Sequence, residues 1–212
     1  MSDSSLVVAF MNIKGQTKLK IDKQMQIEAF LKFYKCDILH LQESNIESDT
    51  FSTCDFITSS YNIEPNNSPT LYGTASLIKS TLTYENIQCD TQGRVLLFDI
   101  CGITFGNVYL NSGTDAVAKN GREHMCSEIL PNMLLNSKDL GCIGGDFNCV
   151  IDKMDATRNP DTKMSKCLQR LVKLKKWFDS FRAIHPTANE FSRYYENAGT
   201  DGASRIDRCY HF

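Results

Sequence analysis

Short apolar runs of strand length alternate with amphipathic helical segments along the whole chain, and this alternation limits the folds available to it. The longer apolar runs span residues 6–12, 37–43, 103–110 and 141–148, and shorter strand candidates span 54–59, 74–79, 83–90 and 94–100. Helical periodicity spans residues 23–35, 118–135 and 165–178, and residues 190–210 have the pattern of a hairpin. The pattern predicts mixed sheets with helices packed outside them. About ten strands fit two facing sheets better than one open sheet.

The 212 residues are expected to form one domain, since a domain typically takes about 150 residues. No apolar run approaches the roughly 20 residues that a membrane-spanning helix needs, and the N-terminus lacks the basic start of a signal peptide. We therefore expect a soluble protein with no membrane contact. The nine cysteines form no CxxC pair, so reduced, mostly buried thiols are expected rather than zinc ligands or disulfides. Residues 62–73 are predicted to form a surface loop.

The net charge of −2, from 23 basic and 25 acidic residues, argues weakly against a nucleic-acid-binding protein, because such proteins usually carry a basic excess. The charge available for binding DNA depends on how many carboxylates serve as metal ligands or catalytic groups. Five of them belong to the candidate motifs described next, namely Glu43, Asp146, Asp152, Asp155 and Asp207. Setting these five aside leaves 20 acidic against 23 basic residues, so net charge alone does not decide the question.

Polar residues stand at the carboxyl ends of four predicted strands. These residues are Asn12, Glu43, Tyr109 and Asp146, and Asn148 follows Asp146 on the same side of an extended chain. Ligands of α/β sheets bind outside the carboxyl ends of the strands, where loops leave side chains free to converge. The sequence therefore predicts one pocket built from these ends. Asp207 lies within the last strand candidate.

The residue types in this group favour one kind of chemistry. The chain has no GxSxG, P-loop lysine, GxGxxG or HExxH motif. What remains is a set of carboxylates, amides and a tyrosine, all of which offer oxygen atoms. Hard oxygen ligands suit Mg²⁺, which is typically held by one or two carboxylates and completed by substrate phosphate. This composition indicates phosphoester hydrolysis.

Five motifs occur in an order similar to that of the endonuclease/exonuclease/phosphatase superfamily: Asn12 after its strand, LQES at Glu43, NVYLNSG at Tyr109, GGDFN at Asp146 and SRID at Asp207. Within that superfamily, the chain most resembles the apurinic-type endonuclease domains of non-LTR (LINE-type) retrotransposons. The segments GGDFNCVIDKMDA, DSFRAIHP and SRID carry this narrower resemblance. It covers nearly the whole chain.

The resemblance implies a four-layer α/β sandwich of two mixed sheets flanked by helices, and Mg²⁺-dependent nicking of double-stranded DNA, with Mn²⁺ as a substitute metal. The nick would leave a 3′-hydroxyl that primes reverse transcription of the element's RNA. By position, Glu43 and Asn12 would bind the metal, and Asp146 would orient or deprotonate the attacking water. Asn148 and Tyr109 would grip the scissile phosphate, and Asp207 would hold a histidine. The implied protein is monomeric, is synthesised in the cytoplasm, acts on chromosomal DNA in the nucleus, and is joined to a reverse transcriptase domain.

Two positions depart from the family pattern. Ser112 stands where the family has an asparagine three residues after the tyrosine, so one phosphate contact is altered. The family's SDH motif, which supplies the active-site histidine, has no counterpart before Phe212, so we expect residues 1–212 to be a domain that lacks its last strand. His211 is not a substitute, because four strand residues would separate it from Asp207 by about 13 Å. Nicking by this form is expected to be weak.

Several further residues have a DNA-binding and a structural interpretation. The basic residues of 163–176 form either a phosphate-tracking face or, by preference, a solvated helix face. The hairpin tip at residues 196–202, flanked by Arg193, Tyr194 and Tyr195, is expected to enter a minor groove. Ser204 and Arg205 are equally balanced between a phosphate contact and a structural role. The remaining polar residues are interpreted as structural, namely His40, His124, His185, Asp152 and Asp155.

Two alternatives to the nuclease stay open. The first is a phosphatase of the same fold that acts on inositol phosphates or lipids. The second is a DNA-binding fragment that is inert because the histidine strand is missing. Three tests separate these hypotheses from the nuclease. They are relaxation of supercoiled plasmid, release of inorganic phosphate from inositol substrates, and the effect of restoring the downstream residues.

Overall fold

A computed structural model describes residues 5–16, 19–47, 49–69, 72–158, 165–197 and 200–212. The chain forms two compact units. The first contains residues 1–101 and 105–109, and the second contains residues 102–104 and 110–212. Among the described residues, no helix has the length and apolar character needed to cross a membrane. All nine cysteines are free, and five of them are buried.

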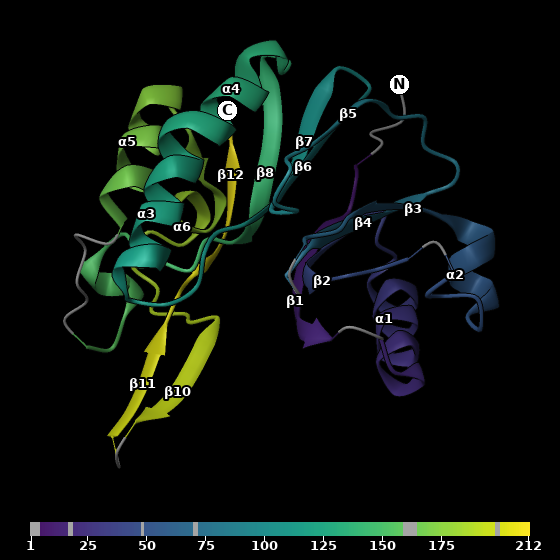
Figure 1. Ribbon diagram of the computed structural model, residues 1–212, viewed down its shortest axis with the longest axis horizontal. Coiled ribbons are helices and arrows are strands. Elements are labelled where there is room, and N and C mark those ends of the chain that lie inside the picture. The colour runs from purple at the N-terminus through teal and green to yellow at the C-terminus, as the bar shows by residue number, and fades with distance from the viewer. Residues whose placement is uncertain (1–4, 17–18, 48, 70–71, 159–164, 198–199) are drawn as a thin grey trace. The chain divides into compact units, whose positions relative to one another are not determined.

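The first unit is organised around a mixed four-stranded sheet of order β1-β2-β4-β3 (Figure 1). Its strands are β1 (Val8–Gln16), β2 (Ile38–Ser44), β4 (Thr74–Lys79) and β3 (Tyr61–Asn66). Strand β2 runs parallel to β1 and antiparallel to β4, which in turn is antiparallel to β3. Helix α1 (Ile21–Tyr34) buries Ile27 and Leu31 in the same apolar cluster as Leu39 and Leu41 of β2. The helix predicted over 23–35 is thus present and packs through Ile27 and Leu31, although Ile21, Met25, Phe33 and Tyr34 are exposed.

The same unit contains helix α2 (Asp55–Ser60) and strands β5 (Glu85–Cys89), β6 (Val95–Ile100) and β7 (Ile103–Tyr109). Strand β6 pairs antiparallel with β5, and every one of its side chains is buried. Buried amides cross-link the interior. The Nε2 of Gln42 donates to Oδ1 of Asn107 at 2.7 Å, and the Nδ2 of Asn107 donates to the carbonyls of Leu41 and Ala75 at 2.9 Å each. These buried bonds link β7 to β2 and β4, with which it forms no strand pairing.

The second unit begins with an irregular helical run, which consists of α3 (Ala116–His124), the π-helical turn η1 (Met125–Ile129), α4 (Leu130–Met133) and the 3₁₀ turn η2 (Leu134–Asn136). The sequence predicts one helix over 118–135 that kinks or ends at Pro131. The structure shows the kink as a change of hydrogen-bonding pattern, since the π turn directly precedes α4, whose first turn contains Pro131. Proline lacks an amide hydrogen, and a wider turn accommodates its ring.

Strand β8 (Leu140–Asp146), the 3₁₀ turn η3 (Lys153–Asp155), α5 (Lys166–Lys175), β9 (Phe178–Asp179) and α6 (Ser180–Ile184) follow. The chain then forms the hairpin β10 (Arg193–Asn197) and β11 (Thr200–Ser204) and ends in β12 (Asp207–His211). Strand β12 lies between β8 and β9 and is antiparallel to both. Its Tyr210 is 1% exposed and packs against the rings of Phe147 and Trp177. The hairpin extends beyond the rest of this unit (Figure 1).

Three predictions about individual elements are wrong. Residues 54–59 form α2 rather than a strand, and the hydroxyls of Thr58 and Ser59 bond to carbonyls three and four residues earlier, as a helix allows. Residues 61–66 form β3 rather than the start of a loop, because an edge strand tolerates Pro65. The predicted hairpin ends at Ser204, so Asp207 belongs to β12 and pairs with β8.

The buried amide pair gives a prediction about stability. Replacing Asn107 by Leu removes the acceptor of Gln42 and leaves buried polar groups without their partner, so we expect a loss of about 2–4 kcal/mol of unfolding free energy. Asn62→Leu on the exposed side of β3 serves as the control and should change stability by less than about 0.5 kcal/mol. Urea denaturation followed by circular dichroism measures both, and equal stability of the two variants would contradict the proposed cross-link.

Candidate functional site

In the first unit, three of the five residues predicted at strand ends meet at one carboxylate oxygen, although β1 continues to Gln16, so that Asn12 lies inside its strand and not at its end. The Nδ2 of Asn12 donates to Oε1 of Glu43 at 3.0 Å, and the hydroxyl of Tyr109 donates to the same oxygen at 3.2 Å. Asn12 lies on β1, Glu43 on β2 and Tyr109 at the end of β7. The structure therefore brings these three predicted residues together, although they are separated by 31 and 66 positions in the sequence.

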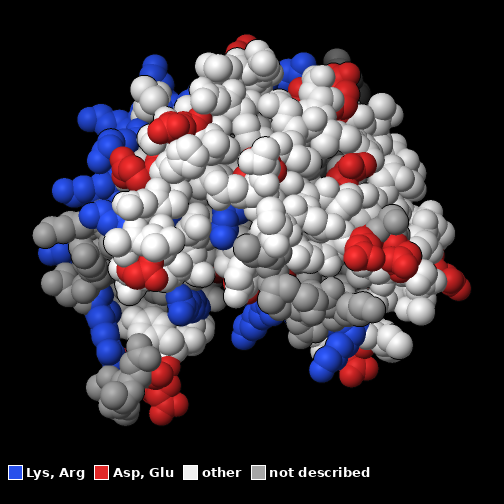
Figure 2. Space-filling view, in the orientation of Figure 1, with Lys and Arg blue, Asp and Glu red and all other residues white. Residues whose placement is uncertain are grey.

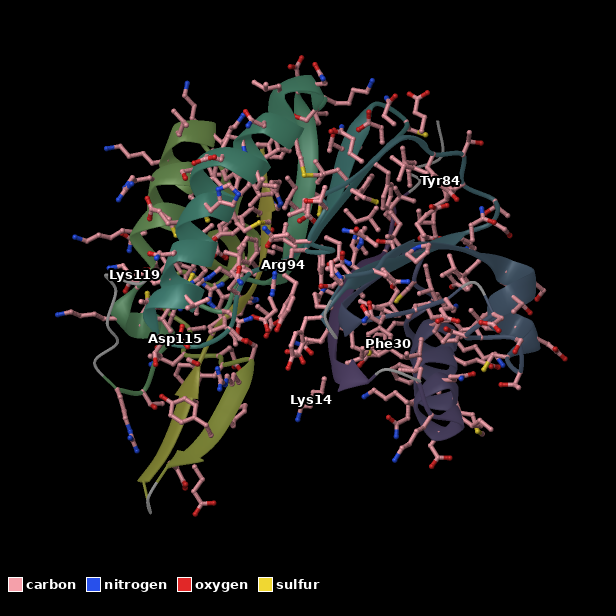
Figure 3. All side chains as sticks on the ribbon, in the orientation of Figure 1. Lys14, Phe30, Tyr84, Arg94, Asp115 and Lys119 are labelled. Atoms are coloured by element: carbon pink, nitrogen blue, oxygen red, sulfur yellow. The ribbon has the colours of Figure 1, made fainter. Side chains whose placement is uncertain are left out.

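Local backbone geometry turns Glu43 out of its strand. Every other residue of β2 is buried, whereas Glu43 is half-buried and has a φ of 52°, in the left-handed region. Non-glycine residues adopt this conformation rarely, and such positions cluster at functional sites. Lys14 also has a positive φ, and its amide donates to Oδ1 of Asn12 at 2.9 Å. Its exposed side chain extends away from β1 (Figure 3).

The donor set of this group fits Mg²⁺ better than a transition metal. It offers one carboxylate and neutral oxygens, with no thiolate or imidazole at the site. In the described part of the chain, no three His, Cys, Asp or Glu side chains gather as a metal-binding group. Mg²⁺ commonly retains several waters and takes only one or two carboxylates. Of the two predicted metal ligands, Glu43 presents the anionic group, and Asn12 holds its orientation.

In the second unit, Asp146 and Asn148 form a tight turn at the end of β8. The amide of Asn148 donates to Oδ1 of Asp146 at 2.8 Å, and Nδ2 of Asn148 donates to the carbonyl of Leu110 at 2.9 Å. The amide of Leu110 donates to the carbonyl of Asp146, also at 2.9 Å. Asn148 has a φ of 49°, a conformation that asparagine adopts more readily than most residues. The predicted pair is thus held by backbone contacts on both sides.

Asp207 lies directly opposite Asp146 in the β8–β12 pairing, so the two side chains leave the same face of the sheet. Burial raises the pKa of the Asp207 carboxyl above its ordinary value, although a side-chain bond involving Ser192 and the charge of Arg208 lower it. His211 lies farther along the same strand, and its Nδ1 is 2.9 Å from the hydroxyl of Ser180. This contact agrees with the prediction that His211 does not serve Asp207.

The predicted DNA contacts fall into two groups. Ser112 and Arg193 are exposed, and Tyr195 is half-buried with the Arg193 guanidinium 5.9 Å from its ring centre. Residues 198 and 199 of the predicted tip lie outside the described residues. Ser204 and Arg205 are only 6% and 4% exposed. The DNA contacts predicted for these two residues are therefore wrong, because neither side chain is accessible to a phosphate.

Arg205 belongs to a buried ionic cluster of two aspartates and three arginines, which are Asp155, Asp179, Arg182, Arg205 and Arg208. Nε of Arg205 is 2.9 Å from Oδ1 of Asp155, and its Nη2 is 2.7 Å from Oδ2 of Asp179. Nη2 of Arg208 is 2.9 Å from Oδ2 of Asp155. The cluster ties the η3 turn and the start of α6 to the residues on either side of Asp207. Asp155 is thus structural, as predicted.

Other structural predictions also hold. The side chain of Asp152 accepts the amide of Met154 and caps η3. His40 is fully buried, stacks on Phe10 and has Nδ1 2.7 Å from the hydroxyl of Ser76, and burial lowers its pKa to about 3. It is a neutral core histidine.

Basic side chains gather over α5, on the left of the view in Figure 2. Those that are exposed on α5 and just after it are Lys166, Arg170, Lys173 and Lys176, and Lys163 lies outside the described residues. The apolar side chains of this segment differ in exposure. Leu168 and Leu171 are buried, whereas Leu174 and Phe178 are 73% and 64% exposed.

Sequence reasoning missed the two amides beneath the first group. Both Gln42 and Asn107 are fully buried. Gln42 immediately precedes Glu43 in β2, and Asn107 lies two residues before Tyr109 in β7. Their bond holds the strands that carry the carboxylate and the phenol. The signal was available, because an amide inside an otherwise apolar strand needs a buried partner.

No protein-family model and no curated protein matches the sequence. Solved structures do match over nearly its whole length. The 3′ phosphatase NExo from Neisseria, solved with a product DNA hairpin, aligns with a TM-score of 0.76 at 17% identity over 98% of this chain and 86% of its own. An AP endonuclease from Archaeoglobus fulgidus aligns with a TM-score of 0.73 at 19% identity over the same shares. The catalytic domain of Xenopus laevis APE2 gives 0.72 at 20% identity over 96% and 81%.

These likenesses show the fold. The chain is α/β with two large mixed sheets flanked by helices, as in the AP endonucleases, so the predicted fold class is confirmed.

The ionic cluster gives a prediction with a matched control. Asp155→Asn should lower the unfolding free energy by about 3–5 kcal/mol, because it leaves buried arginines without their counter-charge. Asp152→Asn, three residues earlier and exposed, should cost at most about 1 kcal/mol, since asparagine also caps helices well. Guanidinium denaturation at neutral pH measures both. A difference below about 1 kcal/mol between the variants would contradict a supporting role for the cluster.

The same cluster predicts a pH dependence. Burial alone would raise the pKa of Asp155, but Arg205, Arg208 and Arg182 outweigh it and hold the pKa well below its ordinary range. A carboxyl whose pKa is depressed by folding stabilises the protein above its unfolded pKa of about 3.9. This stability is lost as the pH falls from about 4 towards the folded pKa. Asp155→Asn should therefore flatten the acid side of the stability profile, measured by thermal unfolding between pH 2 and 6.

Proposed function

We propose that this chain is a Mg²⁺-dependent phosphodiesterase that nicks one strand of double-stranded DNA. The observation that carries the proposal is the convergence of Asn12 and Tyr109 on one oxygen of Glu43 at the end of a buried strand. Among the structural neighbours, one is titled a 3′ phosphatase bound to product DNA and others are titled AP endonucleases. These neighbours support the proposal that this chain hydrolyses a phosphate ester of DNA.

Each residue of the first group has a defined task in this proposal. Glu43 would hold the cation, and Asn12 and Tyr109 keep its carboxylate in one orientation by donating to a single oxygen. Bound Mg²⁺ supplies Lewis-acid stabilisation of the charge that develops on the phosphate oxygens. When a phosphate binds, the single hydrogen of the Tyr109 phenol would be donated to a phosphate oxygen in place of Glu43.

The second group supplies the acid–base part of the proposal. Asp146 accepts a hydrogen bond from the attacking water and orients it, with its own position fixed by the amide of Asn148. The side-chain amide of Asn148 is held by Leu110 through one hydrogen, and its other hydrogen can be donated to a phosphate oxygen. Asp207, opposite Asp146, would orient a histidine.

The narrower part of the proposal concerns the biological setting. The segments GGDFNCVIDKMDA and SRID support a LINE-type retroelement endonuclease. In that setting the nick leaves a 3′-hydroxyl that primes reverse transcription by a domain of the same polyprotein. We propose a monomeric protein that acts on nuclear DNA, with the exposed Arg193 and Ser112 and the half-buried Tyr195 as DNA contacts.

Plasmid relaxation tests the proposed activity. Supercoiled plasmid incubated with excess protein and Mg²⁺ should yield open circles that carry ligatable 3′-hydroxyl ends, and EDTA should abolish the product. Release of inorganic phosphate from inositol phosphates, without relaxation, would instead support a phosphatase. Binding of plasmid without relaxation would favour an inert DNA-binding protein and contradict the nuclease.

The role of Glu43 has a matched control four residues later. Glu43→Gln should lower the single-turnover nicking rate by about 100-fold or more and raise the Mg²⁺ concentration needed for half-maximal rate by about tenfold. Glu47→Gln, which changes an exposed carboxylate, should leave both values unchanged. Equal rates and Mg²⁺ dependence for Glu43→Gln and the unmodified protein would contradict the proposed metal site.

A further inference from the structure

Arg94 contacts Tyr109, which bonds to Glu43, and has no role in the function proposed above. It directly precedes β6, at the end of a turn that the carboxylate of Asp90 organises. That carboxylate accepts the amides of Gln92 at 3.0 Å, Arg94 at 2.6 Å and Val95 at 2.7 Å. Gly93 has a φ of 75°, and a Cβ there would lie 2.6 Å from the amide nitrogen of Ser68. The turn therefore fixes the backbone from which the Arg94 side chain leaves.

The Arg94 side chain is held against the tyrosine that contacts Glu43. The carbonyl of Arg94 accepts the amide of Tyr109 at 2.8 Å, which makes the two residues neighbours across adjacent strands. The guanidinium carbon of Arg94 is 5.1 Å from the centre of the Tyr109 ring, within the range of a cation–π contact. Its Nη1 is 3.4 Å from the Tyr109 carbonyl. One tyrosine thus contacts the carboxylate through its hydroxyl and the guanidinium through its ring.

The charge of Arg94 is not neutralised by a neighbouring acid. Within the described residues, Arg94 forms no ion pair, and the nearest carboxylate along the chain, that of Asp90, is occupied by backbone amides. The side chain is half-exposed. A guanidinium has five N–H donors, and the single long bond to the Tyr109 carbonyl uses one of them. An arginine with free donors at a proposed phosphodiester site is suited to bind a phosphate in two-pronged fashion.

We infer that Arg94 binds a phosphate of the DNA strand that is cut, and that the Tyr109 ring holds its guanidinium in place for this contact. The inference rests on the proposed function and adds a substrate-binding residue to it. Electrostatics gives a further reason, because the negative charge of Glu43 repels DNA and an unpaired cation close by offsets that repulsion. A merely structural arginine, which covers the tyrosine ring, would not affect how binding depends on salt.

DNA binding as a function of salt distinguishes these roles without requiring catalysis. The probe is a fluorescein-labelled 20-base-pair duplex, with Ca²⁺ present, and anisotropy gives the dissociation constant at several KCl concentrations. Arg94→Gln should weaken binding by roughly 10-fold at low salt, and the slope of log K against log salt should fall by about 1. Arg94→Lys should keep most of the slope but still bind more weakly, since lysine provides neither the planar fork nor the same stacking.

Lys32→Gln is the control, because Lys32 lies on α1, where its ammonium pairs with Glu28. It removes the same charge and should leave affinity and slope unchanged. If Arg94→Gln binds DNA like the unmodified protein with an unchanged slope, the inference is overturned while the nuclease proposal stands. If Arg94→Gln does not fold by circular dichroism, the affinity of Arg94→Lys decides: weaker binding supports the inference, and affinity equal to that of the unmodified protein overturns it. Failure of the unmodified protein both to bind the duplex and to nick plasmid would overturn the proposed function itself, and the inference with it.

Discussion

The arrangement of the first unit depends on holding one carboxylate in a fixed orientation at the end of a buried strand. Glu43 can present its charge because Asn12 and Tyr109 donate to the same oxygen. Asn12 is in place because β1 pairs with β2, and the buried bond between Gln42 and Asn107 links β2 to β7, which carries Tyr109. A buried amide without its partner is costly, so this bond favours one alignment over its neighbours. The left-handed backbone at Glu43 is tolerated because its surroundings determine it.

The second unit solves a similar problem with charges instead of amides. Asp207 lies in the chain between Arg205 and Arg208, which both pair with Asp155 in the buried ionic cluster. Isolated buried charges would destabilise the unit, and mutual pairing offsets that cost. Because the cluster also includes Asp179, it joins η3, the start of α6 and the entry to β12. The strand that carries Asp207 is thereby placed opposite Asp146. In both units, buried polar groups thus hold the strand that carries a site carboxylate.

Periodicity in the sequence predicts most of the elements, because strands and helices that bury one face must repeat their apolar residues accordingly. The placing of polar residues after apolar strands also predicts the meeting of Asn12, Glu43 and Tyr109, although Asn12 lies inside β1 and β7 belongs to a different sheet from β1 and β2. Tertiary contacts overrule periodicity elsewhere. The segment 54–59 is too short to show a reliable hydrophobic periodicity. A DNA contact was considered for Arg205 because its buried acidic partners lie 50 and 26 positions away and cannot be inferred from one sequence. Pairing over such distances is decided by the fold.

The most direct test of this account is the position of a bound cation. Crystals grown with Mn²⁺ and an uncleaved DNA duplex can be measured at the manganese absorption edge, where anomalous scattering identifies the ion by its element. The account predicts an anomalous peak bonded to a carboxylate oxygen of Glu43 and to a phosphate oxygen of the bound strand. A well-occupied ion that binds DNA elsewhere on the chain, with Glu43 uncoordinated, would contradict it.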